Sequence, residues 1–273
     1  MVSETVVAQT RPKQSSRRVR QLLAVVLLLL AWQGSVWAIY GGTAEGRLLP
    51  APLDVLRTFA ELLRSGELLR HTELSLLRVL SGLAVAIGLA IPLGLLIGWF
   101  PIARDMGEIL IELFRPIPPL AWIPLAVLWF GLSPASAIFI IVIGAFFPTL
   151  ISTVAGVRGV DRGFLEAAYT LGAASSIDLF RKVVVPAALP SILTGVRISA
   201  GLAWMSVVAA EMIAIDSGLG YMILNARQLF RPDVVLVGMI MIGLIGFTMD
   251  RLLLGLEGVV LRWRRTGRGE TSG

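Results

Sequence analysis

The segment LSLLRVLSGLAVAIGLAIPLGLLIGWF, residues 74–100, decides the fold of this chain. It is apolar almost throughout and is followed at once by Pro101. A helix of about 20 apolar residues crosses the hydrocarbon core of a bilayer, which is about 30 Å thick. Proline lacks a backbone donor and therefore ends helices. The segment predicts a membrane-spanning helix from Leu74 to Phe100.

The composition of the whole chain agrees with a membrane protein. Of its 273 residues, 56% are hydrophobic and 15% are charged, which leaves too few charges for the polar shell of a soluble domain. The apolar residues come in long blocks, whereas the strands of a membrane barrel would give alternating segments of about ten residues. The predicted fold class is an all-α membrane protein.

Five more apolar blocks bring the prediction to about six spans, in a membrane domain at 21–257. These blocks are Leu22–Tyr40, Ile109–Leu132, Ala135–Val157, Ser191–Ile215 and Val234–Leu256. The first resembles the apolar region of a signal peptide, but it is longer and no small-residue cleavage site follows it. Its aromatic residues Trp32, Trp37 and Tyr40 suit a membrane interface. We therefore expect it to be retained as the first span.

A shorter amphipathic segment is predicted within residues 41–73, between the first two spans. After the turn at Pro50–Pro52, apolar residues recur at helical spacing at Val55, Leu56, Phe59, Leu62 and Leu63. Charged residues separate them. This pattern predicts a helix that lies on the membrane surface.

Arginine and lysine residues set the predicted orientation. The N-terminal segment 1–20 and the tail 258–273 are basic, and so are the segments that follow the second and fourth spans. Arginines in the remaining segments are balanced by acidic residues. Cytoplasmic segments carry the excess of positive charge, so both termini and the loop 158–190 are predicted to be cytoplasmic. The net charge of +6 then faces lipid head groups and does not indicate nucleic-acid binding.

The residue types that are missing exclude several kinds of chemistry. The chain has no cysteine, which excludes disulfides, thiolate metal sites and cysteine nucleophiles. Its single histidine, His71, cannot build a multi-histidine metal site and is expected at the surface. No GxxxxGK[ST] motif occurs, so the chain is not expected to hydrolyse ATP. We expect no enzyme activity, no metal site and no bound cofactor.

The loop 158–190 has the signals of two helices joined by a glycine. Asp161 can cap a helix that places Phe164, Leu165, Ala168 and Leu171 on one face, and Gly172 ends it. Ser175–Ser176–Ile177–Asp178 has the spacing of a capping box and starts a second helix, which Pro186 and Pro190 are expected to stop. The second helix would carry Ile177, Phe180, Arg181 and Val184 on one face. Either the pair is a docking element for a partner, or it is a plain linker, although plain linkers are usually shorter and more polar.

Five residues of this loop carry a family resemblance. Glu166, Ala167, Ala168, Gly172 and Pro186 resemble the EAA loop of permeases in binding-protein-dependent ABC importers. The resemblance implies the type I permease fold and a pair of coupling helices that insert into a cleft of an ATPase subunit. Glu166 would then pair with a basic group of that ATPase. The Gly172–Pro186 spacing is one residue longer than in the family, and Val185 replaces a common leucine.

Three further stretches narrow the resemblance to one group of these permeases. ELFRPIPPLAWIPLAVLWFGL (112–132), VVAAEMIAIDSGLGYMI (207–223) and DVVLVGMIMIGLIGF (233–247) resemble permeases for taurine, aliphatic sulfonates, nitrate and bicarbonate, the taurine permeases most closely. The similarity covers residues 50–257. It implies transport by alternating access, ATP and Mg²⁺ bound by partner ATPases, a solute-binding protein outside the membrane, and a second permease copy, with taurine or another sulfonate favoured as solute.

Two features of the spans point to a solute pathway, each with an alternative. Prolines at 116, 118, 119 and 124 break the third span, so the Arg115–Pro124 segment either lines or hinges the pathway or is a tight turn. Glu211 in the fifth span either lines the pathway or pairs with Arg227 or Arg231. Arg197 in that span could snorkel to the lipid head groups. The candidate pathway residues are Arg115, Pro116, Pro118, Pro119, Trp122 and Glu211.

Glycines in the second and sixth spans let helices approach closely, for packing or for dimer contacts.

Two other functions compete with the ABC permease. A secondary transporter would need its own coupling-ion site and internal repeats, and neither is clear in the sequence. An intramembrane enzyme would need a convergent set of catalytic groups, and none is visible.

Overall fold

The computed structural model describes residues 14–40, 49–173 and 175–262, and all regular structure within them is helical. The helices are α1 (Gln14–Tyr40), α2 (Pro52–Arg64), α3 (Glu67–Trp99), α4 (Pro101–Phe114), α5 (Ile123–Phe130), α6 (Pro134–Arg158), α7 (Arg162–Thr170), α8 (Ser176–Leu179), α9 (Val185–Ala214), α10 (Leu219–Gln228) and α11 (Pro232–Val260). A 3₁₀ turn, η1 (Pro119–Trp122), precedes α5, and a π turn, η2 (Phe180–Val184), joins α8 to α9. The predicted all-α fold class is confirmed.

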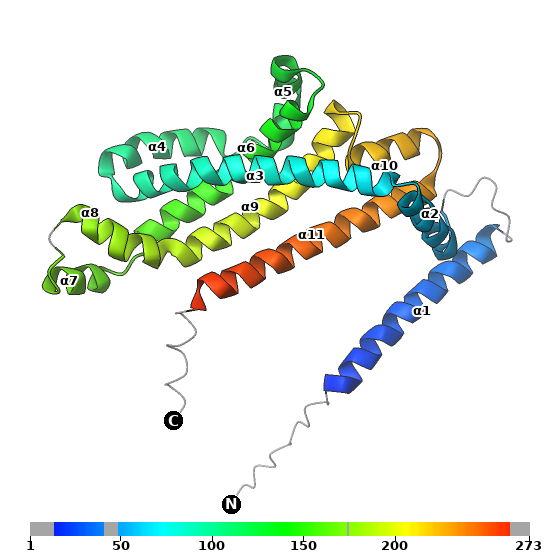
Figure 1. Cartoon of the computed structure of the whole chain (residues 1–273), viewed down its shortest axis with the longest axis horizontal. Helices are drawn as coiled ribbons and strands as arrows, with labels where there is room; N and C mark the ends of the chain where they lie inside the picture. Colours follow the sequence, from blue (N-terminus) through cyan, green and yellow to red (C-terminus); the bar gives the residue numbers. More distant parts are fainter. Residues whose placement is uncertain (1–13, 41–48, 174, 263–273) are drawn as a thin grey trace, which may run out of the picture.

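Three long helices, α3, α6 and α9, form the centre of the molecule (Figure 1). Glycines bring α3 against α6: a Cβ atom built on Gly82 would lie 2.5 Å from Cγ2 of Ile141, and one built on Gly94 would lie 2.6 Å from Cβ of Thr153. No larger side chain fits at such distances, so these positions require glycine for close helix packing. For these two glycines the packing role, rather than dimer contact, accounts for their presence.

Four helices of the described residues are long and apolar enough to cross a membrane: α3, α6, α11 and the continuous helix Ser176–Ala214. The pair α4 and η1–α5 passes the same test only as one broken span, bent by 84°. The first predicted span, Leu22–Tyr40, lies in α1, where the described residues include the apolar stretch Val26–Ile39. The basic ends at 1–13 and 263–273 lie outside the described residues.

The fifth span begins earlier than predicted, because Pro186 and Pro190 do not stop the preceding helix. Instead α8, η2 and α9 form one helix of 39 residues, and Pro190 lies inside it. In the π turn the Val185 amide donates to the Phe180 carbonyl, one residue further back than in an α-helix. This shift of register accommodates Pro186, which has no N–H to donate. The prediction that the two prolines end the helix was wrong.

The segment before the second span was also predicted only in part. The amphipathic helix is present as α2, but α3 begins at Glu67, ahead of the predicted Leu74. Val55 and Leu62 of α2 are buried against the core, and the Thr58 hydroxyl donates to Asp233 of α11 at 2.8 Å. The helix is therefore packed on α11 as well as amphipathic.

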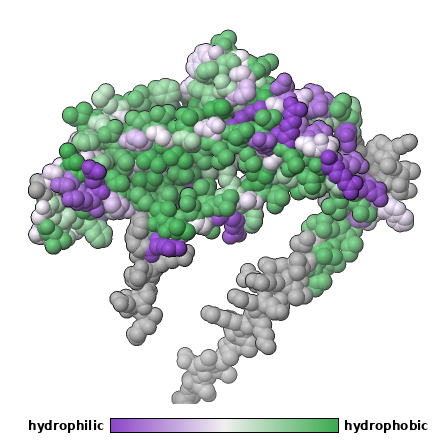
Figure 2. Space-filling view, in the orientation of Figure 1, coloured by the Kyte–Doolittle hydropathy of each residue, from purple (hydrophilic) through white to green (hydrophobic). Residues whose placement is uncertain are grey.

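The surface separates into an apolar middle and polar ends. Figure 2 shows a broad hydrophobic face over the long helices, with hydrophilic residues gathered at the end that carries α7 and α8 and at the opposite end near α2 and α10. This is the distribution expected of a chain whose long helices lie in a bilayer and whose two ends meet water.

Candidate coupling loop and membrane pocket

The first half of the loop 158–190 is a short helix fixed at both ends. The Asp161 carboxylate accepts a hydrogen bond from the Gly163 amide at 2.8 Å and so caps α7. At the other end, Gly172 has φ +92°, and the Ala173 amide donates to the Ala168 carbonyl at 2.9 Å. This is a Schellman cap, in which glycine accepts the left-handed backbone that L-residues avoid. Both caps were predicted from the sequence.

The second half of the loop begins the long helix of the fifth span. The Ser175 hydroxyl accepts from the Asp178 amide at 3.1 Å, as the capping-box spacing predicted. Val184 is fully buried, and the Phe180 ring lies 5.6 Å from the ring of Trp99 at the end of α3. The π turn is therefore anchored to the body of the molecule.

The side chains of α7 and α8 leave an apolar face exposed at this end. Phe164, Tyr169, Leu171 and Ile177 are 64%, 57%, 88% and 68% exposed. Of the residues predicted on one face of α7, Phe164 and Leu171 are exposed, whereas Leu165 contacts the cluster around Val157 and Val184. An exposed apolar face on a capped, ordered loop has the character of a protein-binding surface.

The motif residues lie around this face. Glu166 and Ala167 are exposed on α7, Ala168 is half-buried, and Gly172 is exposed at the turn. Pro186 is exposed on α9, where it lines a groove of about 530 Å³ together with Phe164, Lys182 and Pro190. The loop thus brings Glu166 and Pro186 to the same end of the molecule, although the groove itself does not include Glu166.

The proline-rich break of the third span lies beside α6. After α4 ends at Phe114, the chain turns through residues 115–118 and resumes in η1 and α5. Pro116 and Pro118 are exposed in this turn and Pro119 starts η1. Trp122 packs between Phe114 and Phe139, with ring centroids 6.2 and 6.3 Å away, and its buried indole N–H has no partner among the described residues.

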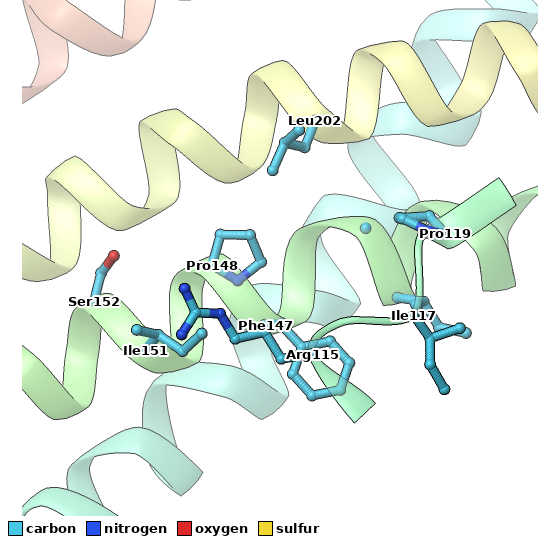
Figure 3. A pocket seen from close by; sticks show the side chains of 10 residues that line it. Arg115, Ile117, Pro119, Phe147, Pro148, Ile151, Ser152 and Leu202 are labelled. Atoms are coloured by element: carbon cyan, nitrogen blue, oxygen red, sulfur yellow. The ribbon is translucent and has the colours of Figure 1, made fainter. Parts of the chain in front are cut away.

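A pocket of about 340 Å³ opens where this break meets α6 and α9 (Figure 3). Its walls come from the turn after α4, from α6 and from α9. The lining residues are Arg115, Ile117, Pro119, Ile143, Gly144, Phe147, Pro148, Ile151, Ser152 and Leu202. Two predicted pathway residues, Arg115 and Pro119, therefore lie in one pocket, while Pro116, Pro118, Trp122 and Glu211 do not line it.

Glu211 lies elsewhere, fully buried in a hydrogen-bonded network near the N-terminal end of α3 and the C-terminal end of α9. Its carboxylate accepts from Arg78 at 2.8 Å, from the Ser75 hydroxyl at 2.8 and 2.9 Å, and from the Gly220 amide at 3.0 Å. Arg78 also donates to the carbonyl and hydroxyl of Ser217. A buried charge is retained in a protein when it is paired and hydrogen-bonded.

The partner of Glu211 is therefore Arg78, so the alternative of a pairing with Arg227 or Arg231 was wrong. Arg231 instead pairs with Asp233 at 2.9 Å. The same network includes His71, expected at the surface, whose Nδ1 accepts from the Gly218 amide at 2.9 Å. Sequence reasoning passed over Arg78, although an arginine within an apolar block is itself a signal that a buried carboxylate is nearby.

Arg197 has a partner within the chain as well. Its guanidinium forms two hydrogen bonds to the Asp250 carboxylate of α11, at 2.6 and 3.1 Å. A two-point contact of this kind holds both groups in one geometry. The pair links α9 to α11, a role that differs from the predicted contact with head groups.

The comparisons with known proteins agree with this architecture. A family model described as "binding-protein-dependent transport system inner membrane component" matches residues 90–258. The chain is 54% identical over 171 residues to a protein of Methanocaldococcus jannaschii described as an ABC transporter permease, and the match covers 62% of this chain and 64% of that protein. It is 38% identical over 245 residues to a Bacillus subtilis protein described as an aliphatic sulfonates transport permease, covering 89% and 88%.

Other relatives are named as permeases for taurine, in Escherichia coli, and for nitrate, in Synechocystis. Among solved structures, the chain resembles a subunit in the crystal structure of an amino acid ABC transporter, with a TM-score of 0.56 at 19% identity over 75% of this chain and 97% of that one. The predicted resemblance is thereby confirmed. The chain belongs to the family of inner-membrane permease components of binding-protein-dependent ABC transport systems.

Proposed function

We propose that this chain is the permease subunit of an importer that moves a small sulfonate, such as taurine or an alkanesulfonate, across the membrane. The named relatives support this solute class, since two of them are permeases for aliphatic sulfonates and for taurine. Nitrate is the second candidate, because a relative that is 32% identical over 256 residues is named for nitrate import. All three solutes carry an anionic group of oxygen atoms.

The proposal rests mainly on the structure of the loop 158–190, which is called the coupling loop from here on. Contacts within the chain cap α7 at Asp161 and Gly172 and cap α8 at Ser175. The loop presents Glu166 among exposed apolar side chains, and none of the described residues pairs with that carboxylate. A cytoplasmic ATPase with an apolar cleft and a basic group at its rim would complement both features.

Energy for transport would come from this ATPase, which would bind ATP and Mg²⁺. Its closure would move the coupling loop, and the spans would alternate between inward and outward states. An extracytoplasmic binding protein would deliver the solute. A second copy of the chain would complete the pathway, since the pocket beside Arg115 opens at the surface of a single chain.

The test uses the tagged chain purified from its native membrane with the subunits that accompany it. Glu166→Ala is expected to reduce the amount of co-purifying ATPase and the rate of ATP-driven sulfonate uptake into proteoliposomes, while the yield of permease stays the same. Glu73→Ala is the matched control. This exposed carboxylate lies near the N-terminal end of α3, whereas the loop packs near the C-terminal end of that helix, at Trp99. Equal ATPase recovery from Glu166→Ala and Glu73→Ala would overturn the docking role. Uptake of nitrate but not of sulfonates would overturn the solute class.

A further inference from the structure

The pocket beside α6 has one charged residue among the ten described residues that line it. That residue is Arg115, and the hydroxyl of Ser152 is another polar side chain in the wall. In Figure 3 the Arg115 side chain extends across Phe147 toward Ile151 and Ser152, and Leu202 faces it from α9. The remaining walls are apolar. Arg115 is exposed, so its guanidinium is accessible to a ligand that enters this pocket.

The pocket lies inside the predicted span. Phe147 and Ser152 are 11 and 6 residues from the last residue of α6, Arg158, which at 1.5 Å per residue places them about 9–17 Å along the helix from that end. Leu202 lies in the middle of the predicted fifth span. A charged residue at such depth faces water or a partner group, since a charge at the centre of a spanning helix costs at least about 2.5–3.5 kcal/mol in lipid.

Arg115 has no counter-charge within the described part of the chain. Other arginines do: Arg78 pairs with Glu211, Arg158 with Glu108, and Arg197 with Asp250. Neither an ion pair nor a side-chain hydrogen bond connects Arg115 to any described residue, even though Glu112 is three residues away on α4. A guanidinium left unpaired in a pocket can donate all of its N–H groups to a ligand.

The break in the third span is what aims Arg115 into the pocket. Its backbone amide closes the last turn of α4 by donating to Ile111 at 2.9 Å, and the prolines that follow turn the chain away from the helix axis. The α4 helix is held in place by the Arg158–Glu108 pair and by the close packing of Gly107 on Ile97. Arg115 therefore projects from a fixed position.

From this geometry we infer that the pocket is a solute subsite in which Arg115 binds the anionic head group of the transported molecule. The planar guanidinium offers paired donors to the oxygens of a sulfonate, and Ser152 adds a hydroxyl donor beside them. Phe147, Ile143 and Leu202 form the apolar wall that a short carbon chain would contact. The positive charge of Arg115 would repel a small cation from the pocket. The identity of the solute in this inference rests on the proposed function. The preference of the pocket for anions over cations does not depend on that function.

The test exploits the absence of cysteine from the chain. In the intact transporter complex, Ser152→Cys places a single permease thiol in the pocket wall, and its reaction rate is measured with two methanethiosulfonate reagents, one carrying a sulfonate and one a trimethylammonium group. Adding Arg115→Gln is expected to lower the ratio of the sulfonate rate to the ammonium rate about tenfold, the effect of one charge several ångströms away in a partly aqueous site. Arg115→Lys should keep most of the ratio. Ethanesulfonate should slow the labelling, and tetramethylammonium should not.

The controls separate this inference from the proposed function. Ile151→Cys, also in the wall, replaces Ser152→Cys if that variant fails to assemble, and Leu244→Cys on α11 measures the background. An unchanged rate ratio in the Arg115→Gln background overturns the subsite, even if ATP-driven sulfonate uptake is intact. A shifted ratio without such uptake supports the subsite and overturns the proposed solute. Dissociation of the permease pair in Arg115→Gln, with no change in ratio, would show that Arg115 binds the second copy instead.

Discussion

Replacing Arg78 by methionine should destabilise the permease more than any change on its surface. Methionine has a similar length and fills the space, so the substitution mainly removes charge. The Glu211 carboxylate, which is 0% exposed, would then retain hydrogen bonds from Ser75 and Gly220 but lose its counter-charge. Removing one partner of a buried ion pair costs about 3–5 kcal/mol, because the remaining charge is left uncompensated.

A second substitution should restore part of this loss. In Arg78→Met combined with Glu211→Gln, the neutral amide oxygen still accepts from Gly220, and no buried charge remains. The double variant lacks the three hydrogen bonds that Arg78 makes to Glu211 and Ser217, but it leaves no ionised group buried without a counter-charge. The expected order of stability is wild type, then the double variant, then Arg78→Met.

Thermal unfolding of the purified protein in detergent, followed by tryptophan fluorescence, measures this order. A loss of about 3–5 kcal/mol corresponds to a fall in Tm of about 10 °C for a chain of this size. Glu73→Ala, an exposed change two residues before Ser75, should leave Tm within about 1 °C of wild type. A double variant less stable than Arg78→Met would refute the reasoning, since the penalty would then not arise from an unpaired charge.

Three further outcomes are expected. Gly94→Val should lower Tm, because its Cβ would meet Thr153 at 2.6 Å. Gly88→Val has nothing within 4 Å of its Cβ and should leave Tm nearly unchanged. Equal shifts in Tm for the two variants would contradict close packing of α3 on α6. Gly172→Ala places a Cβ at φ +92°, at a cost of about 1–2 kcal/mol, and should reduce ATPase co-purification more than it reduces permease yield. Asp250→Leu should leave Arg197 unpaired and lower the monodisperse fraction on gel filtration, while exchanging the two residues should restore it; no rescue would mean that the pair is not structural.

The parts of the fold that could be predicted are those that depend on residues close together in the sequence. Spans such as Ala135–Val157 and Val234–Leu256 match α6 and α11 to within a few residues, because apolar length alone defines them. The caps at Asp161, Gly172 and Ser175 were also predicted, since each satisfies backbone groups within a few residues of itself.

The parts that could not be predicted depend on groups distant in sequence or on competing local rules. Arg78 and Glu211 are separated by 133 positions, and nothing local identifies them as partners. The proline rule failed at Pro186, because it assumes a regular α-helical register and the chain adopts a π turn there instead. The prolines indicated a break at Arg115–Pro124, but the bend of 84° could not be predicted from them, because η1 and α5 beyond the break contact α6, which is distant in sequence from α4.

The unbroken helix from Ser176 to Ala214 has a mechanical consequence. At 1.5 Å per residue its 39 residues extend about 58 Å, about twice the thickness of the hydrocarbon core. A tilt of about 5° imposed at its first turn displaces its last turn by about 5 Å. The first turn belongs to the exposed loop, and the last turn carries Glu211 and the segment that Arg78 holds. A tilt imposed at the loop would therefore displace the end that carries Glu211, to the extent that the π turn and Pro190 do not bend.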